Sequence, residues 1–497
     1  MNSINKRAVT MAALAAFAGC ANMPSVGPDY AVPEADAEAF ALPDAGAPTT
    51  NLTATCEYRP AESNEDVRVT ISNDYIARWW ERLNDPVLAG LVESAVSNNV
   101  SFLVAQRRLE QALWQMVGTY SAFMPKFSVD GSATRSEAHR HNRSVRGAYR
   151  HSELDTFNGG LSGRWEIDIF GGSRRASEAA LAQVEEAGCS VEQAWVALTG
   201  ELGKKYITLR TTQELIAVAR TNLVLQTETY DILKSRFDSG IGDELAVNQC
   251  AYVVETTRAR IPTLLAQEEA LKNAIAILAG EKPGALAETL CEDRRRDWML
   301  APQKLSEMPL NMIRSRPDVS VVERRLAARV AQVGVAKSMW YPKFYISGGV
   351  GMESTQFSNF AQPGSFYASI GPSVSWPIFQ GGAVYSQIKA AESAVEEARL
   401  NYELALDSAY AEVRSNYSAY TQQYHRYQAL QAAVKAATDA VVISKDLYKN
   451  GLRDFNNVLD AQRSRLNLEE ELVLSRGQIT TSLIDLYSSL GGGLASE

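Results

Sequence analysis

The chain has 497 residues and a formal net charge of −9, with acidic and basic side chains interspersed along it. It contains no basic stripe of the kind that binds nucleic acid, so nucleic-acid binding is excluded. Histidine is scarce, with four in the chain, and no two cysteines have a metal-ligand spacing such as C-x-x-C. We therefore expect no metal and no other cofactor.

The first residues predict a secretory signal. Lys6 and Arg7 precede an apolar run over 8–19, which is too short for the roughly 20 residues of a membrane-spanning helix. Cys20 follows at the position of the acylated cysteine of a lipoprotein, so we expect cleavage before Cys20 and attachment of lipid, including palmitate, to it. Ala21 lacks the acidic side chain that commonly retains lipoproteins in the inner membrane, which favours the outer membrane. An ordinary cleaved signal with an incidental cysteine is the alternative.

The rest of the chain contains one sequence unit twice. MPKFSVDG, starting at Met124, recurs as YPKFYISG, starting at Tyr341. LKSRFDSG, ending at Gly240, resembles SKDLYKNG, ending at Gly451. The copies are offset by roughly 210 residues, which indicates two structural repeats per chain.

Each repeat predicts a helix, two strands, a long helix that ends at a glycine tip, and a shorter returning helix. The helices are expected over 85–123, 172–237 and 244–278 in the first repeat, and over 318–340, 383–448 and 454–490 in the second. At a rise of 1.5 Å per residue the long helices would extend about 100 Å, which no compact domain accommodates. Apolar residues every seven positions, such as Leu459, Leu466 and Val473, predict helices that coil around one another.

Four segments alternate between apolar and polar residues and predict strands, in hairpins within 125–170 and 342–378. Within 161–169, for example, Leu161 and Trp165 alternate with charged residues such as Arg164. Each segment has about 9 to 11 residues, the length of a tilted transmembrane strand. The polar stretch 135–158 predicts a long hairpin loop.

Four strands are too few to close a barrel, and open strand edges cannot lie in hydrocarbon because their N–H and C=O groups would lack partners. Several chains are therefore expected to share one barrel. Two chains would supply eight strands with a filled interior, and three would supply twelve with room for a pore. A water-soluble sandwich with one buried face is the alternative.

Several short motifs occur in a fixed order after Cys20. They are VGPDYAVP from Val26, WWERLNDPVLAGLV from Trp79, RWEIDIFGGSRRASEAA from Arg164, SRFDSGIGDELAV from Ser235, RSRPDVSVVERRLAA from Arg314, WPIFQGG from Trp376, VLDAQR from Val458 and LGGG from Leu490. With these motifs in this order, the chain resembles the outer-membrane efflux protein family, which comprises the TolC-like outer-membrane factors. It resembles the lipid-anchored branch of that family in particular. The matching motifs extend over nearly the whole chain.

The resemblance implies a mostly α chain with transmembrane β-strands. It implies a homotrimer in which a 12-stranded outer-membrane barrel is continued by a 12-helix coiled-coil tunnel through the periplasm. The function implied is passive export of small molecules (drugs, metabolites or other toxic compounds) received from an inner-membrane transporter and its periplasmic adaptor protein. The chain would contact outer-membrane lipid and would not be an enzyme.

The expected organisation follows from the repeats and the resemblance together. It comprises a signal peptide (1–19), a lipid-anchored extension with a girdle segment (20–78), a first repeat (79–284), a girdle linker (285–316) and a second repeat (317–497). Both girdle segments are longer than the family pattern. The first contains Cys56 in addition to Cys20, the second contains Cys291, and we predict a disulfide between Cys56 and Cys291.

The VLDAQR motif is the candidate periplasmic gate. Asp460 and Arg463 lie three residues apart on one helix face, where an intrahelical ion pair on a solvated surface is one interpretation. The other, which the resemblance favours, is a ring of three Asp460 carboxylates around a threefold axis, with Arg463 linking neighbouring helices. Asn456 stands one turn earlier, where relatives often have an apolar ring, and Glu470 is expected to point outward. The resemblance also assigns adaptor docking to the tips at Gly240 and Gly451.

Two other classes of function fit the sequence less well. A periplasmic coiled-coil scaffold or adaptor lipoprotein would explain the helices but not the four amphipathic strands. An enzyme on a helical scaffold is disfavoured because no G-x-S-x-G, H-E-x-x-H or P-loop motif occurs. In RPD at 316–318, Pro317 and Asp318 are typical of a helix start, so we expect this motif to be structural.

Overall fold

The computed structural model describes residues 25–33, 68–69, 78–83, 85–141, 149–291, 304–305, 313–450 and 452–492. Cys20, Cys56 and Gly451 therefore lie outside the described residues. The chain divides into two compact units, which we treat separately. The strand unit comprises Met1–Pro33, Leu109–Ala187 and Val322–Tyr402, and the helix unit comprises Glu34–Arg108, Gly188–Val321 and Glu403–Glu497.

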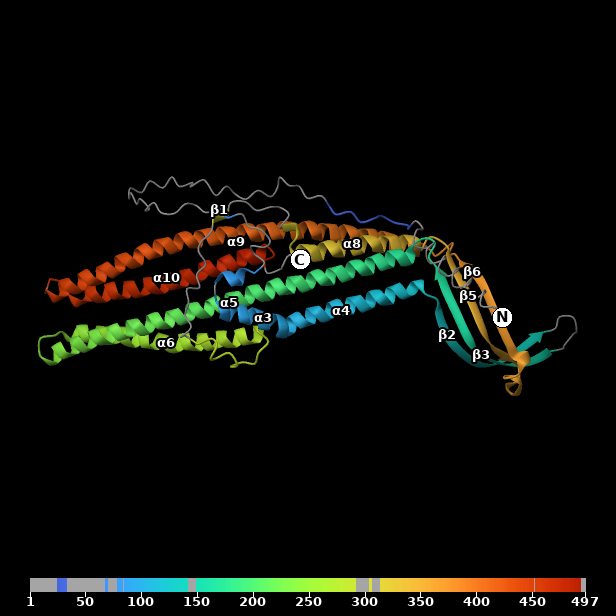
Figure 1. The fold of residues 1–497 in the computed structure, drawn as a ribbon, viewed down its shortest axis with the longest axis horizontal. Coiled ribbons are helices and arrows are strands. Elements are labelled where there is room, and N and C mark those ends of the chain that lie inside the picture. The colour runs from blue at the N-terminus through green and yellow to red at the C-terminus, as the bar shows by residue number, and fades with distance from the viewer. Residues whose placement is uncertain are drawn as a thin grey trace. The chain divides into compact units, whose positions relative to one another are not determined.

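Two long helices and two shorter returning helices dominate the chain (Figure 1). The α-helices are α3 (Pro86–Asn98), α4 (Val100–Tyr120), α5 (Gly172–Asp238), α6 (Glu244–Leu278), α8 (Pro317–Ser338), α9 (Ala383–Lys449) and α10 (Phe455–Ser489). Short 3-10 helices are η2 (Trp79–Leu83), η3 (Ser121–Phe123), η5 (Phe357–Asn359) and η6 (Pro363–Ser365). The bounds of α5, α6, α9 and α10 agree with those predicted to within about two residues.

The helix expected over 85–123 is interrupted, which corrects the prediction. Asn99 has an extended backbone (φ −66°, ψ 121°) and separates α3 from α4. Its side chain accepts from the backbone N–H of Phe102 at 3.0 Å and so caps α4, while its amide donates to the carbonyl of Leu278 at 2.9 Å. The break is therefore held by a partner nearly 180 residues away in sequence.

Four antiparallel strands form the sheet of the strand unit, in the order β2-β3-β5-β6 (Figure 1). Their bounds are β2 (Lys126–His141), β3 (Tyr149–Ile167), β5 (Lys343–Ser354) and β6 (Phe366–Ser375). The pairing of β3 with β5 joins the hairpins of the two repeats into one sheet. The prediction of a loop over 135–158 was wrong at both ends, because β2 and β3 remain paired over much of that stretch. An ion pair between Arg135 and Glu153 links the two strands there.

The two faces of this sheet differ in chemistry, as the alternation predicts. One face carries Leu161, Trp165, Ile346, Val350 and Ile370, and the other carries serine, tyrosine and charged residues. Both repeats close their sheet end in the same way, because a tryptophan in or just after a strand donates its indole N–H to a carbonyl that follows the preceding helix. The pairs are Trp165 to Phe123 (2.9 Å) and Trp376 to Trp340 (3.1 Å).

The helix unit has a core built around the beginning of the first repeat. Trp79 is fully buried, and a Cβ at Gly203 would lie 2.2 Å from its ring, so glycine there allows α5 to approach closely. In α10 the predicted seven-residue positions Leu459, Leu466 and Val473 are buried, whereas Phe237 at the end of α5 is exposed. The coiled-coil interpretation is therefore confirmed for this face of α10.

The two girdle segments meet through a short parallel ladder. Strand β1 (Arg68–Val69) pairs with β4 (Lys304–Leu305) in the helix unit. Cys291, however, carries a free thiol, and Cys56 lies outside the described residues. The structure therefore does not support the disulfide predicted between Cys56 and Cys291.

A search of the described residues finds no single helix long and apolar enough to cross a membrane. By length and composition, only the bent pair α3 and α4, the latter taken on to Phe123, passes that test jointly.

Candidate functional site: the returning helix α10 and its contacts

The four helix ends near the two tips enclose a small apolar core. It is formed by the buried residues Leu233, Ala246, Cys250, Val253, Phe455, Val458 and Leu459. The rings of Tyr448 and Phe455 pack edge to face across the second tip, with centroids 5.2 Å apart. Because this core contains residues of α5, α6 and α10, the buried face of α10 is fixed where the predicted gate residues begin.

The three predicted gate residues occupy the opposite, exposed face of α10. Asn456, Asp460 and Arg463 are all exposed, and the Asp460 side chain is 77% accessible. Arg463 Nη1 lies 3.9 Å from Asp460 Oδ1, at the outer limit of an ion pair. The Arg463 guanidinium also lies over the ring of Tyr252 on α6, 5.4 Å from its centroid. The sequence prediction placed the three residues on one face and missed Tyr252.

Three consecutive glutamates follow this face, and each reaches a different helix. Glu469 accepts from the Asn222 amide of α5 at 3.1 Å. Glu470 pairs with Arg260 of α6 at 2.8 Å, and Glu471 lies 3.5 Å from Arg426 of α9. The helix that carries the predicted gate residues is therefore tied to α5, α6 and α9. Sequence reasoning missed these ties, and Glu470, which was expected to point outward, is partly exposed and pairs with Arg260.

The first tip is exposed and turns at Gly240. The glycine has φ +75°, a left-handed conformation that favours glycine, and a Cβ built there would meet no described atom within 4 Å. Two apolar side chains stand in solvent at the tips, Ile241 at 85% exposure and Leu452 at 69%. Gly451, the other predicted tip residue, lies outside the described residues.

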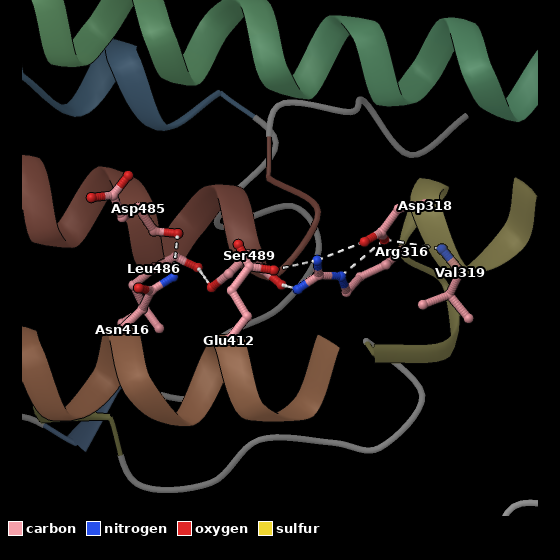
Figure 2. A network of polar contacts seen from close by, with 8 residues as sticks. All are labelled: Arg316, Asp318, Val319, Glu412, Asn416, Asp485, Leu486 and Ser489. Atoms are coloured by element: carbon pink, nitrogen blue, oxygen red, sulfur yellow. Dashed lines mark hydrogen bonds and ion pairs between the residues drawn. The ribbon is translucent and has the colours of Figure 1, made fainter. Parts of the chain in front are cut away.

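The RPD motif forms a polar network at the start of α8 (Figure 2). The Arg316 side chain donates to both carboxylate oxygens of Asp318, at 3.0 and 2.8 Å, and to Glu412 of α9 at 2.6 Å. It also donates to the carbonyl of Ser489, the last residue of α10. Arg316 is 6% exposed, so one buried guanidinium joins the beginning of α8 to α9 and to the end of α10.

Arg316 and its carboxylate partners stabilise one another's charged forms. Burial raises the pKa of the Asp318 carboxyl, but the hydrogen bonds and charge of Arg316 and the N–H of Val319 outweigh burial and lower that pKa below its usual range. Burial likewise lowers the pKa of Arg316, and Asp318 and Glu412 more than restore it. The expected structural role of this motif as a helix start is confirmed by the first residue of α8, Pro317.

A second buried network holds the first repeat. The phenol of Tyr206 donates to Asp85, the N-cap of α3, and accepts from Arg210 at 2.9 Å. Burial raises the pKa of Tyr206, so the phenol stays protonated. Gln213 continues the network by donating to Glu268 of α6 at 3.0 Å. All of these groups support one another, and none is left as a nucleophile or general base directed into a cleft.

No part of the described chain holds three or more His, Cys, Asp or Glu side chains arranged to bind a metal ion. What the chain presents is a sheet with one apolar and one polar face, together with long helices that place an acidic and a basic residue on an exposed stripe. A sheet of this kind is typical of a membrane-spanning protein.

The comparison with known proteins agrees. The family model described as outer membrane efflux protein matches residues 91–281 and 309–492. The chain belongs to the outer membrane efflux protein family.

Relatives and solved structures extend the match over most of the chain. Nodulation protein T of Rhizobium leguminosarum bv. trifolii is 28% identical over 445 residues, which is 88% of each chain. Outer membrane protein OprJ of Pseudomonas aeruginosa is 27% identical over 418 residues, 84% of this chain and 86% of the relative. The solved structure of the outer-membrane channel OprN has a TM-score of 0.81 at 28% identity, and the match covers 94% of this chain and 99% of that one.

Family membership confirms several predictions at once. The chain is an outer-membrane efflux component with the fold of TolC-like channels, and members of this family are transport proteins without enzymatic activity. Its location is the outer membrane.

Proposed function

We propose that three copies of this chain form the outer-membrane duct of a tripartite export system. In this system an inner-membrane transporter and a periplasmic adaptor deliver small molecules, which pass through the duct without further chemistry. The observation that carries the proposal is the four-stranded sheet, whose edge strands in the described chain are β2 and β6. Joining the β6 edge of one copy to the β2 edge of the next leaves no open edge in the membrane, and three copies give the expected 12 strands.

The predicted gate has support from the exposed stripe of α10. Around a threefold axis, three Asp460 carboxylates would form a negative ring, and three Arg463 side chains would lie within reach of Tyr252. Asn456 would add an amide ring one turn nearer the tip. A polar constriction of this kind stays hydrated, so its opening depends on charge more than on dewetting.

Adaptor docking is assigned to the tips. Ile241 and Leu452 are exposed apolar residues beside Gly240 and Gly451, and such residues on a polar rod mark a protein contact. Because the tips end the two helical hairpins, a partner that grips them would act on the ends of α6 and α10.

The N-terminal anchor is assigned to Cys20, acylated and held in the outer membrane. The described stretch Ser25–Pro33 supports a fixed exit for the anchor. The N–H of Val26 donates to the carbonyl of Phe170 at 3.2 Å, and Arg175 pairs with Asp29 at 2.6 Å. Tyr30 donates to Glu323 of α8 at 3.3 Å.

Small molecules are the proposed cargo. Among the relatives are a pyoverdine export outer membrane protein and a toluene efflux pump outer membrane protein, both of Pseudomonas putida and both 26% identical to this chain. The names of these relatives differ in cargo, which supports a duct that selects weakly and leaves the choice of cargo to the transporter upstream.

The full-length chain, purified in detergent, tests the assembly. Graded amine cross-linking should give a ladder that ends at three copies, and the same preparation should form discrete conducting channels in planar bilayers. Labelled palmitate should appear on the wild-type chain and be absent from Cys20→Ser, which should still assemble because the strands anchor it. A ladder that stops at one copy together with an absence of conductance would overturn the proposal.

A further inference from the structure

The apolar face of the sheet contains a groove. Its volume is about 530 Å³, within the range of roughly 300–1,000 Å³ that small-molecule sites occupy. The side chains around it are nearly all apolar, and on this face they comprise Pro125, Phe127, Leu161, Trp165, Ile346, Val350, Ala368 and Ile370. Phe127 and Ile370 form its two rims and are 69% and 84% exposed.

The floor of the groove is made by two glycines. Gly163 of β3 and Gly348 of β5 are directly paired, and their outer neighbours in the same row are Phe127 and Ile370. A Cβ at Gly163 would lie 2.9 Å from the Phe127 ring, so that ring leans over the glycine. The two missing side chains leave a hollow between the tall rims, with Leu161 and Val350 at one end along the strands and Trp165 and Ile346 at the other.

The N-terminal segment is fixed at the base of the same sheet. A Cβ at Gly171, four residues after the end of β3, would lie 2.8 Å from the Cα of Ser25, so the two backbones touch. Ser25 is five positions after Cys20. Extended chain spans at most about 3.6 Å per residue, so Cys20 lies within about 18 Å of Ser25. The near end of the groove, at Trp165, is six residues before Gly171, and a strand of that length covers about 20 Å or less.

We propose that the groove is the seat of an acyl chain carried by the chain's own Cys20. The inference rests on the proposed acylation of Cys20. An alkyl chain laid along the hollow is flanked by Phe127 and Ile370, and the contact of Ser25 with Gly171 leaves Cys20 within reach of the Trp165 end. Each copy in the assembly would hold its own anchor in this way.

Tethering, rather than hydrophobicity, selects this occupant. An acyl chain gains little apolar burial by leaving other lipid tails, so the groove prefers none of them on hydrophobic grounds alone. A chain attached about 18 Å or less from Ser25 is present at an effective concentration in the millimolar range, and it keeps that advantage over exchanging lipids. The close packing against glycine backbone then adds dispersion contacts that a fluid tail lacks.

Photo-crosslinking of the anchor tests the seat. Cells are fed a fatty acid that carries a diazirine and an alkyne, and the full-length protein is purified, placed in nanodiscs of unlabelled phosphatidylglycerol and phosphatidylethanolamine, and irradiated. The only photoreactive acyl groups left are then those attached to the protein. Peptide mapping should find cross-links to the segments around Gly163 and Gly348.

Filling the groove should abolish these cross-links without removing the label. Gly163→Leu requires only that the exposed Phe127 ring move, and Ala368→Phe fills the groove from an exposed position that strains no backbone. The matched control is Ala133→Leu, an exposed residue of β2 on the same face, paired with Phe157 outside the groove.

Each outcome has a defined meaning. Label on the wild type, cross-links in the groove and their loss in both filling variants but not in Ala133→Leu support the seat. Label on the wild type with cross-links only to nanodisc lipid, or equal groove cross-links in Ala368→Phe and Ala133→Leu, overturns it while acylation stands. Absence of label from the wild type, as in Cys20→Ser, overturns the acylation and with it the seat.

Discussion

Glu470 on α10 accepts hydrogen bonds from Arg260 on α6 with both of its carboxylate oxygens, at 2.9 and 2.8 Å. The pair is partly exposed, and such ion pairs contribute about 0.2–1 kcal/mol. Its importance is positional, because it joins the two returning helices about two turns from Arg463, whose guanidinium lies over Tyr252 on α6.

A double-mutant cycle on Arg260 and Glu470 should show coupling. Arg260→Ala and Glu470→Ala should each raise the single-channel conductance, and the double variant should match either single variant because the same contact is lost. The control pair is Glu396 and Arg399, an exposed ion pair at 2.8 Å on α9, whose removal should leave conductance unchanged. Additive effects in the Arg260–Glu470 cycle would mean that the two side chains act separately.

Removal of a predicted gate residue should change the conductance more than loss of the Arg260–Glu470 pair. Asp460→Ala or Arg463→Ala removes one charge per copy from the exposed stripe, so three copies change the ring by three charges. We expect higher conductance, weaker cation preference in Asp460→Ala, and greater entry of large antibiotics into cells. Conductance, ion selectivity and antibiotic entry that all equal those of the wild type would remove both residues from the gate.

Charge on the two faces of the sheet should have opposite consequences. Ile370 and Ser369 are neighbours on β6 that point to opposite faces, the first to the apolar face. Arginine in place of Ile370 should cost about 2–4 kcal/mol near the bilayer midplane, whereas arginine in place of Ser369 should be tolerated. The amount of heat-resistant trimer measures both, and equal amounts would mean that the faces are assigned wrongly.

The sequence was sufficient for the regular elements and for the two sheet faces. Seven-residue periodicity and residue alternation are local patterns. Near neighbours in sequence are enough to predict that Leu466 is buried and that Trp165 lies on the apolar face of its strand. It was insufficient for the break at Asn99, because the carbonyl of Leu278 that fixes the Asn99 side chain is distant in sequence. The extent of β2 and β3 was missed because their outer ends are polar, and partners such as Arg135 and Glu153 stabilise them across the strands.

The polar ties between helices were not predictable for the same reason. A run of three glutamates on a coiled coil is typical of a solvated face, and nothing local indicates that Glu469, Glu470 and Glu471 meet three different helices. The shared exposed face of Asn456, Asp460 and Arg463 was predictable because the three residues lie on one helix. The contact of Arg463 with Tyr252 was not, because Tyr252 belongs to α6.

Arg316 should stabilise the helix unit. Arg316→Ala removes four hydrogen bonds and leaves the Ser489 carbonyl and the Asp318 carboxylate without this partner. We expect a loss of about 1–3 kcal/mol in the free energy of unfolding, as for hydrogen bonds to charged groups. Arg324→Ala, which breaks partly exposed pairs with Glu185 and Glu323 in the strand unit, is the control and should cost under about 1 kcal/mol.

The same network predicts a loss of stability in acid. The pKa of Asp318 is lower in the folded protein than its ordinary value of about 3.9, so its contribution is present above that value and is lost as the pH falls through the folded pKa. Thermal unfolding of wild type and Arg316→Ala over this acidic range measures the effect. The two should converge as the pH falls, and a constant difference at every pH would show that Asp318 does not titrate with this network.

Cys250 should be the least reactive of the described cysteines. Its side chain is 1% exposed in the apolar core at the tips, and burial raises the pKa of its thiol to about 11. Since the thiolate is the reactive form, a maleimide reagent at neutral pH should label Cys291, which is partly exposed, well before Cys250.

Tyr448→Ala opens the packing around Phe455 beside this core and should speed the labelling of Cys250. The control is Tyr385→Ala, which changes an exposed residue of α9. Rapid labelling of Cys250 in the wild type would show that the packed core at the tips opens on the timescale of the experiment.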